Sequence, residues 1–123
     1  MTQLNAATVE IPARVRAAVT AIDDRQGQSL QVLDLDKISE FTEFFLICTG
    51  ATERQVRAIA DGVRDQLREE GTKPLHVEGE QHGQWVLMDY GDFLVHIFSE
   101  PMRDYYRLED LWADAPNVTE QFR

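Results

Sequence analysis

The chain of 123 residues has a single cysteine, Cys48, which excludes an intramolecular disulfide and a cysteine-based zinc knuckle. No apolar run approaches the roughly 20 residues of a membrane-spanning helix, and the N-terminal residues lack the apolar core of a signal peptide. We therefore expect no membrane association and a cytoplasmic location. With 43% hydrophobic and 28% charged residues, the composition predicts one globular domain that needs no covalent cross-links.

Basic residues are also scarce. Twelve Lys and Arg stand against 22 Asp and Glu, a net charge of −10. Because nucleic-acid binding depends on neutralising phosphates with Lys and Arg, we expect no direct nucleic-acid site. An acidic surface suits a basic protein partner, which it would approach by electrostatic steering. Composition leaves a second interpretation open, in which the acidity only keeps the protein in solution.

The hydrophobic pattern predicts alternating helices and strands. Helices are expected from Ile11 to Gly27, from Thr52 to Gly71 and from Pro101 to Trp112, and strands at 29–35, 44–49, 75–79, 84–90 and 93–98. A strand, a helix and a further strand in this order imply at least one parallel pair. The predicted fold class is therefore α/β: a single domain with a mixed sheet of about five strands flanked by helices.

The helix that begins after Thr52 has the clearest signals. Thr52 and Gln55 form a capping-box pattern, and Gly71 follows as a C-terminal cap. Its apolar residues fall on one face at helical spacing: Val56, Ile59, Ala60, Val63 and Leu67. In the terminal helix one apolar stripe is expected to contain Met102, Tyr105, Leu108 and Trp112, and the residues after Trp112 are expected to be a frayed tail.

All three histidines lie in the segment 74–98, which invites a catalytic or metal-site interpretation. His96, however, is in the middle of a strand with apolar neighbours on its face, which favours a packed, hydrogen-bonded histidine. His76 and His82 alone do not have the convergence that zinc requires, because a zinc site needs three or four ligands. We predict no metal site and no cofactor.

One enzymatic alternative is open. Asp34 and Asp36 could hold Mg²⁺, and the turn at Gly50 before a helix could hold a phosphate, which together outline a nucleotidyltransferase. In that superfamily, however, the glycine turn usually precedes the carboxylates, and no lysine lies near this turn. The serines lack a G-x-S-x-G context, and Cys48 lies in an apolar strand where a thiol is normally inert. We therefore predict that the protein is not an enzyme.

Two segments combine aromatic with acidic residues, WVLMDYGD (85–92) and RDYYRLEDLW (103–112). This composition is typical of a protein-binding surface directed at Arg or Lys. The predicted partner-binding residues are Trp85, Met88, Asp89, Tyr90 and Asp92, with Glu78 and Tyr106 at the rim. Strand alternation places Trp85, Leu87 and Asp89 on one face, so Trp85 is either an exposed anchor or a core residue.

Three separated segments, DLDKISEFTEFFLICTGATERQVRAIADGV, KPLHVEGEQHGQWVLMDYGDFLVHIF and RDYYRLEDLWADAP, together resemble the ribosomal silencing factor family, also called Iojap. They agree with that family in order and spacing. The resemblance covers residues 11–116, which leaves residues 1–10 as an N-terminal extension and residues 117–123 as a C-terminal tail.

The resemblance implies a function. Proteins of this family bind the large ribosomal subunit through its fourteenth ribosomal protein, block joining of the small subunit and lower translation when nutrients are scarce. Their fold is similar to that of nucleotidyltransferases without the catalytic set, and free members are commonly homodimers. Two other hypotheses stay open: a nucleotidyltransferase-like enzyme that uses Asp34, Asp36 and the Gly50 turn, and an adaptor for another basic protein.

Overall fold

The computed structural model describes residues 9–123, so most of the predicted N-terminal extension lies outside the described residues. The strands are β1 (Gln28–Asp34), β2 (Phe44–Gly50), β3 (His76–Glu78), β4 (Trp85–Asp89) and β5 (Phe93–Ser99). The helices are α1 (Ala13–Asp24), α2 (Glu53–Glu69), α3 (Glu100–Tyr106), α4 (Leu108–Leu111) and the 3-10 helix η2 (Thr119–Phe122). The predicted single α/β domain with a five-stranded mixed sheet is confirmed.

The strand order in the sheet is β1-β2-β5-β4-β3. β2 and β5 are parallel, and the other neighbours are antiparallel. The predicted parallel pair is therefore present. Its second strand, β5, follows β2 in the chain after α2, β3 and β4. All seven residues of β2 are buried, because β2 has a strand on each side and helices over both faces.

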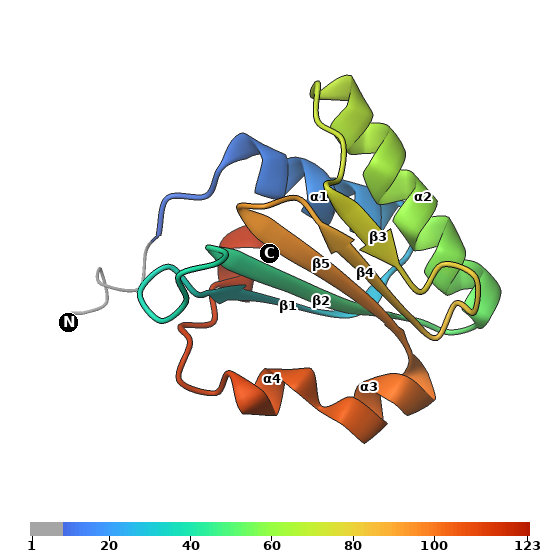
Figure 1. The fold of residues 1–123 in the computed structure, drawn as a ribbon. Helices are drawn as coiled ribbons and strands as arrows, with labels where there is room; N and C mark the ends of the chain where they lie inside the picture. Colours follow the sequence, from blue (N-terminus) through green and yellow to red (C-terminus); the bar gives the residue numbers. More distant parts are fainter. Residues whose placement is uncertain (1–8) are drawn as a thin grey trace.

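The helices divide between the two faces of the sheet (Figure 1). α1 and α2 cover one face, and their apolar side chains pack there against residues such as Val32, Leu46 and Val95. α3 and α4 lie on the other face, over a smaller cluster that includes Phe45, Ile47 and Phe98. Within residues 9–123, no helix has the length and apolarity needed to cross a bilayer.

α2 begins and ends as predicted. The Thr52 Oγ1 accepts from the Gln55 backbone N–H at 3.0 Å, and the Gln55 Oε1 accepts from the Ala51 N–H at 2.6 Å. The reciprocal bond thus reaches one residue further back than a standard capping box. At the other end Gly71 has φ +78°, and the Thr72 N–H donates to the Leu67 carbonyl at 2.8 Å.

The prediction of one continuous terminal helix is wrong. α3 ends at Tyr106, Arg107 adopts a left-handed conformation with φ 47°, and α4 starts at Leu108. This break turns α4 back toward the sheet, so that Leu108 is buried against it. Tyr105, predicted to lie on the apolar stripe, is instead 76% exposed.

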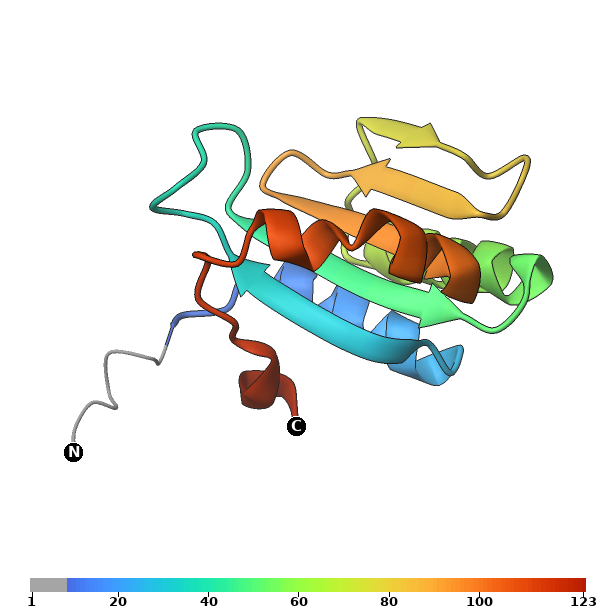
Figure 2. The same ribbon diagram turned by 90° about the horizontal axis from the view of Figure 1, so that it is seen from below.

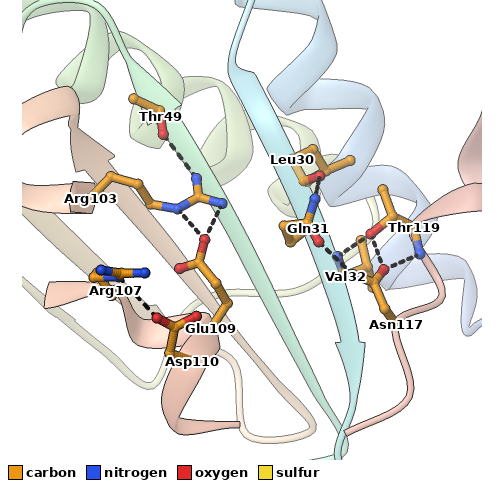
Figure 3. A network of polar contacts seen from close by, with 10 residues as sticks. All are labelled: Leu30, Gln31, Val32, Thr49, Arg103, Arg107, Glu109, Asp110, Asn117 and Thr119. Carbon is orange, nitrogen blue, oxygen red and sulfur yellow. Dashed lines mark hydrogen bonds and ion pairs between the residues drawn. The ribbon is translucent and has the colours of Figure 1, made fainter. Parts of the chain in front are cut away.

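The prediction of a frayed tail is also wrong. Asn117 forms a bridge with Leu33, and the Val118 N–H donates to the Val32 carbonyl at 2.8 Å. The Val32 N–H donates in turn to the Thr119 Oγ1 at 2.8 Å (Figure 3). The tail thus pairs with the outer edge of β1 and satisfies backbone groups there, and it buries Val118.

Ile59 on α2 tests the packing between this helix and the sheet. Ile59 is fully buried, so Ile59→Ala should lower the free energy of unfolding by roughly 2–5 kcal/mol. Arg54→Ala, on the exposed side of the same helix, is the matched control and should change it by less than about 0.5 kcal/mol. Urea unfolding of the two variants checks this, and equal midpoints would contradict the assignment of the buried face.

Removal of residues 117–123 tests the packing of the tail. The truncated chain loses the burial of Val118 and two hydrogen bonds to Val32, so its stability should fall by about 2 kcal/mol or more. The control is Arg123→Ala, which removes only an exposed ion pair with Asp23 and should cost about 0.5 kcal/mol or less. Thermal melting compares the two, and a truncated chain as stable as the full chain would show that the tail contributes nothing.

Candidate partner-binding site

The α3–α4 face of the sheet is only half covered. Seen from this side, α3 and α4 lie over the middle of the sheet, and no helix lies in front of β3 and β4 (Figure 2). The register brings together here the side chains on the outward side of β3 and β4 and their neighbours on β5. We call this surface the open face; it consists of His76, Glu78, Trp85, Leu87, Asp89 and Leu94, with Tyr106 of α3 at its border.

Trp85 lies at the border between the open face and the helix-covered part. Its ring stacks on that of Phe98 with the ring centroids 4.8 Å apart. The centroid of the Tyr106 ring lies 4.7 Å from that of Trp85. Its indole N–H donates to the His96 Nδ1 at 3.2 Å. Trp85 is half-buried, so one side of the ring packs inside the protein and part of its surface is available to a partner. Trp85 is therefore neither fully buried nor fully exposed, and its role as an anchor for a partner stays a prediction.

His96 is a packed, hydrogen-bonded residue, as predicted. It is 4% exposed, and Phe45 packs edge-on against it with ring centroids 4.7 Å apart. Because an indole N–H can only donate, the His96 Nδ1 must accept, and the neutral ring carries its proton on Nε2. That Nε2 has no hydrogen-bond partner among the described residues. Burial lowers the pKa of His96 from 6.5 to about 4, so the ring is neutral at pH 7.

The acidic residues of the predicted surface differ in their surroundings. Asp89 is half-buried, and its Oδ1 accepts from the Gly91 N–H at 2.8 Å, which holds the turn between β4 and β5. The Asp92 carboxylate is exposed and forms an ion pair with Arg14. Glu78 is exposed and contacts His76 on the same strand. Asp89 and Glu78 are the carboxylates on the open face, and Asp92 lies outside it.

Two predicted surface residues belong to the core. Met88 is fully buried and Tyr90 is 4% exposed, and both pack in the cluster under α1 and α2. The alternation along β4 separates the two faces as predicted, but the side that carries Val86, Met88 and Tyr90 is the one that α1 and α2 cover. Burial also raises the pKa of the Tyr90 hydroxyl to about 12. We therefore remove Met88 and Tyr90 from the predicted surface.

Leu87 and Leu94 are half-buried residues of the open face that the sequence did not single out. The alternation of Leu87 with Trp85 and Asp89 is the sequence signal that places it on the open face. The second missed feature is the Arg103 side chain, which donates to Glu109 at 2.9 Å and to the Thr49 Oγ1 at 2.9 Å (Figure 3). Arg103 thereby joins α3, α4 and β2 and holds Tyr106 beside Trp85.

The structure separates the two halves of the proposed nucleotidyltransferase site. Asp34 pairs with Phe44 at the start of β2, whereas Gly50 is the last residue of that strand. A strand of this length spans about 20 Å, so carboxylates and glycine turn cannot act on one phosphate. A Cβ on Gly50 would lie 2.9 Å from the Val56 nitrogen, so close packing between strand and helix accounts for the glycine.

The other side chains that could react or bind a metal are poorly placed for catalysis. Cys48 is fully buried, and burial raises its pKa to about 12, so the thiol is un-ionised and inert at neutral pH. In the part of the chain that the structure describes, no three His, Cys, Asp or Glu side chains converge as metal ligands would.

The pKa of His96 predicts a dependence of stability on pH. The unfolded ring has a pKa near 6.5 and the folded ring one of about 4, so the unfolded state takes up a proton first as the pH falls. The stabilisation is complete above pH 6.5 and is lost between pH 6.5 and 4, which amounts to about 2 kcal/mol at pH 5. Urea unfolding at pH 7 and pH 5 should show this loss in the wild type and a much smaller one in His96→Gln.

The exposed His82 provides the control for this measurement. His82→Gln should keep the wild-type difference between pH 7 and pH 5, because His82 lies in a solvated turn. If His96→Gln loses as much stability as the wild type on acidification, the pH dependence comes from other groups.

Comparison with known proteins agrees with this architecture. A family model described as "Ribosomal silencing factor during starvation" matches residues 8–123. Proteins named Ribosomal silencing factor RsfS are 42% identical in Halalkalibacterium halodurans (85% of this chain and 89% of the relative) and 42% identical in Bacillus subtilis (83% and 86%). A crystal structure of a protein from Chromobacterium violaceum has a TM-score of 0.81 at 36% identity, covering 85% of this chain and 88% of that one.

A second crystal structure, of a protein from Bacillus halodurans, has a TM-score of 0.76 at 40% identity over 85% of this chain and 94% of that one. The family match spans nearly the whole chain, and the relatives agree with it in sequence and in fold. This chain therefore belongs to the ribosomal silencing factor family, whose members have a regulatory role in translation at the ribosome.

Proposed function

We propose that this protein binds the large ribosomal subunit through the fourteenth ribosomal protein and thereby blocks joining of the small subunit. Family membership supports an action on the ribosome. The observation that carries the choice of surface is the open face, where a half-exposed Trp85 lies beside Leu87, Asp89 and the exposed Glu78, on the side of β3 and β4 that no helix covers.

The chemistry of the open face fits a basic protein. Leu87, Leu94 and the outer part of Trp85 can exclude water from a contact, while Asp89 and Glu78 can pair with Arg or Lys at its border. The same carboxylates would repel ribosomal RNA, since its phosphates carry negative charge. A protein component of the large subunit is therefore favoured over RNA as the direct partner.

The proposed block is steric. A folded domain bound to a large-subunit protein at the joining surface would occupy space that the small subunit needs. Reduced joining would lower translation, and the description of the family model connects its members with starvation. The homodimer implied by the resemblance stays a prediction, for which sedimentation equilibrium of the free protein is the measurement.

Sedimentation with purified subunits tests the proposal. The protein should co-sediment with large subunits and less with assembled ribosomes, and its addition before mixing should reduce the fraction of subunits that join. An adaptor for an unrelated basic protein would show neither effect. A nucleotidyltransferase would show Mg²⁺-dependent incorporation of labelled nucleotide, which we do not expect.

Substitutions of Asp89 test most directly whether the open face binds the large subunit. Asp89→Asn keeps an Oδ1 that can accept from the Gly91 N–H and removes only the charge, whereas Asp89→Lys reverses the charge and also loses that turn hydrogen bond. Large-subunit binding should weaken modestly in Asp89→Asn and at least tenfold, about 1.4 kcal/mol, in Asp89→Lys. The salt dependence of association should flatten in both.

A matched charge reversal controls for the overall charge. Glu69→Lys lies at the exposed end of α2, which covers the opposite face of the sheet, and should bind large subunits almost as the wild type does. If Asp89→Lys and Glu78→Lys retain wild-type binding at low salt while the fold is intact, the partner meets a different face.

A further inference from the structure

The loop between β1 and β2, residues 35–43, presents a second apolar and acidic surface. Phe41 at its tip is 94% exposed and Ile38 is 45% exposed. This loop projects from the end of the sheet opposite to Gly50 and the start of α2 (Figure 1). Nothing in the packing of the domain requires an exposed phenylalanine here, and a large side chain so exposed is typical of a contact surface.

Two hollows adjoin this loop. One of about 500 Å³ lies between the segment before α1 and the neighbouring ends of β1 and β2, and one of about 440 Å³ lies between the loop and the β4–β5 turn. The two hollows share Asp36 and Glu43 in their walls. We call the combined surface the acidic end; its carboxylates are those of Glu10, Asp34, Asp36, Glu40, Glu43 and Asp92.

Few ion pairs neutralise these carboxylates. Lys37 lies in the same loop, but its ammonium group forms no ion pair within residues 9–123. Arg14 pairs with Asp92, and within residues 9–123 the other five carboxylates of the acidic end form no ion pair. Residues 1–8 contain no Lys, Arg or His that could supply one. Like charges held together repel one another, and an incoming cation would relieve that repulsion.

An independent feature of the same surface is a hydroxyl without a partner. Thr42 is 7% exposed and lies in the wall of the hollow beside the β4–β5 turn. Its Oγ1 is buried and has no hydrogen-bond partner within the described part of the chain. A buried hydroxyl in this state is costly, and a bound segment that reaches it after a small shift of the loop would supply the missing hydrogen bond.

We propose that the acidic end is a second docking surface, and that it binds an extended, Arg- or Lys-rich segment of a protein that carries an apolar residue for Phe41. Charge complementarity determines the class of partner, because nucleic acid and anionic lipid would be repelled by the same carboxylates. Phe41 would supply the apolar contact, and Glu40 and Glu43 would pair with the cations on either side.

The acidic end is separate from the open face. It could bind a basic segment whether or not the open face binds the large ribosomal subunit. The two surfaces approach each other at the β4–β5 turn, where the Glu43 N–H donates to the Asp92 carbonyl at 2.7 Å. A large-subunit protein with a flexible basic segment could therefore occupy both surfaces at once, and linked contacts of this kind strengthen each other.

The test uses a short synthetic peptide of arginine and serine with one central leucine, and the same peptide with serine in place of that leucine. In NMR titrations the leucine peptide should shift the amide resonances of residues 38–43 and 91–92 more than those of β4. Glu40→Gln/Glu43→Gln should weaken its binding by about fivefold, and Phe41→Ser should abolish the preference for the leucine peptide.

Glu69→Gln/Glu70→Gln at the exposed end of α2 removes the same charge elsewhere and should weaken binding by less than about twofold. Thr42→Val should raise the melting temperature of the free protein and weaken peptide binding, a combination that a purely structural hydroxyl would not give. The proposal is overturned if both glutamine pairs weaken binding equally, or if Phe41→Ser binds both peptides as the wild type does. Large-subunit binding of the Asp89 variants decides the proposed function separately.

Discussion

The side chain of Arg103 determines how much of the sheet is available to a partner. α3 and α4 are too short to be stable alone, and α3 buries no residue fully. Arg103 joins Glu109 to Thr49 in a site where the arginine side chain is only 11% exposed, so these charge-assisted bonds hold both helices on the middle of the sheet. The position of the helices leaves this side of β3 and β4 uncovered and places Tyr106 against Trp85. Arg103, together with the apolar cluster that contains Leu108, thus holds the two helices beside the open face.

The hydrogen bond between Trp85 and His96 couples this surface to the interior. The neutral state of His96 provides the acceptor that orients the indole, and burial of the imidazole maintains that neutral state. An anchor held in one orientation loses little side-chain entropy when a partner binds, which favours affinity. The same coupling means that Trp85 contributes both to stability and to the surface, so its replacement would not separate the two roles, whereas Glu78 and Asp89 touch the core less.

Local signals predicted the parts of the fold that depend on neighbouring residues. The cap at Thr52, the apolar face of α2 and the alternation along β4 are short-range properties, and each was read correctly. The left-handed conformation of Arg107 was not predictable, because no glycine marks this position. It accompanies the ion pair between Arg103 of α3 and Glu109 of α4. Met88 was assigned to the surface because alternation separates two faces without identifying the one that distant helices will cover. Pairing of the tail with β1 likewise depends on an edge that forms some 80 residues earlier in the chain.

The distribution of charge is more informative than its total. Two cations of α2 are neutralised locally, since Arg64 pairs with Asp61 and Glu80, and Arg68 pairs with Asp65. By contrast, most carboxylates of the acidic end form no ion pair in the described chain, and Asp89 and Glu78 add negative charge on the adjoining open face. Part of the surplus negative charge therefore lies where the apolar side chains of both proposed surfaces are exposed. A basic partner would be steered toward that end before any apolar contact forms, and the apolar groups would then decide which basic partner stays bound.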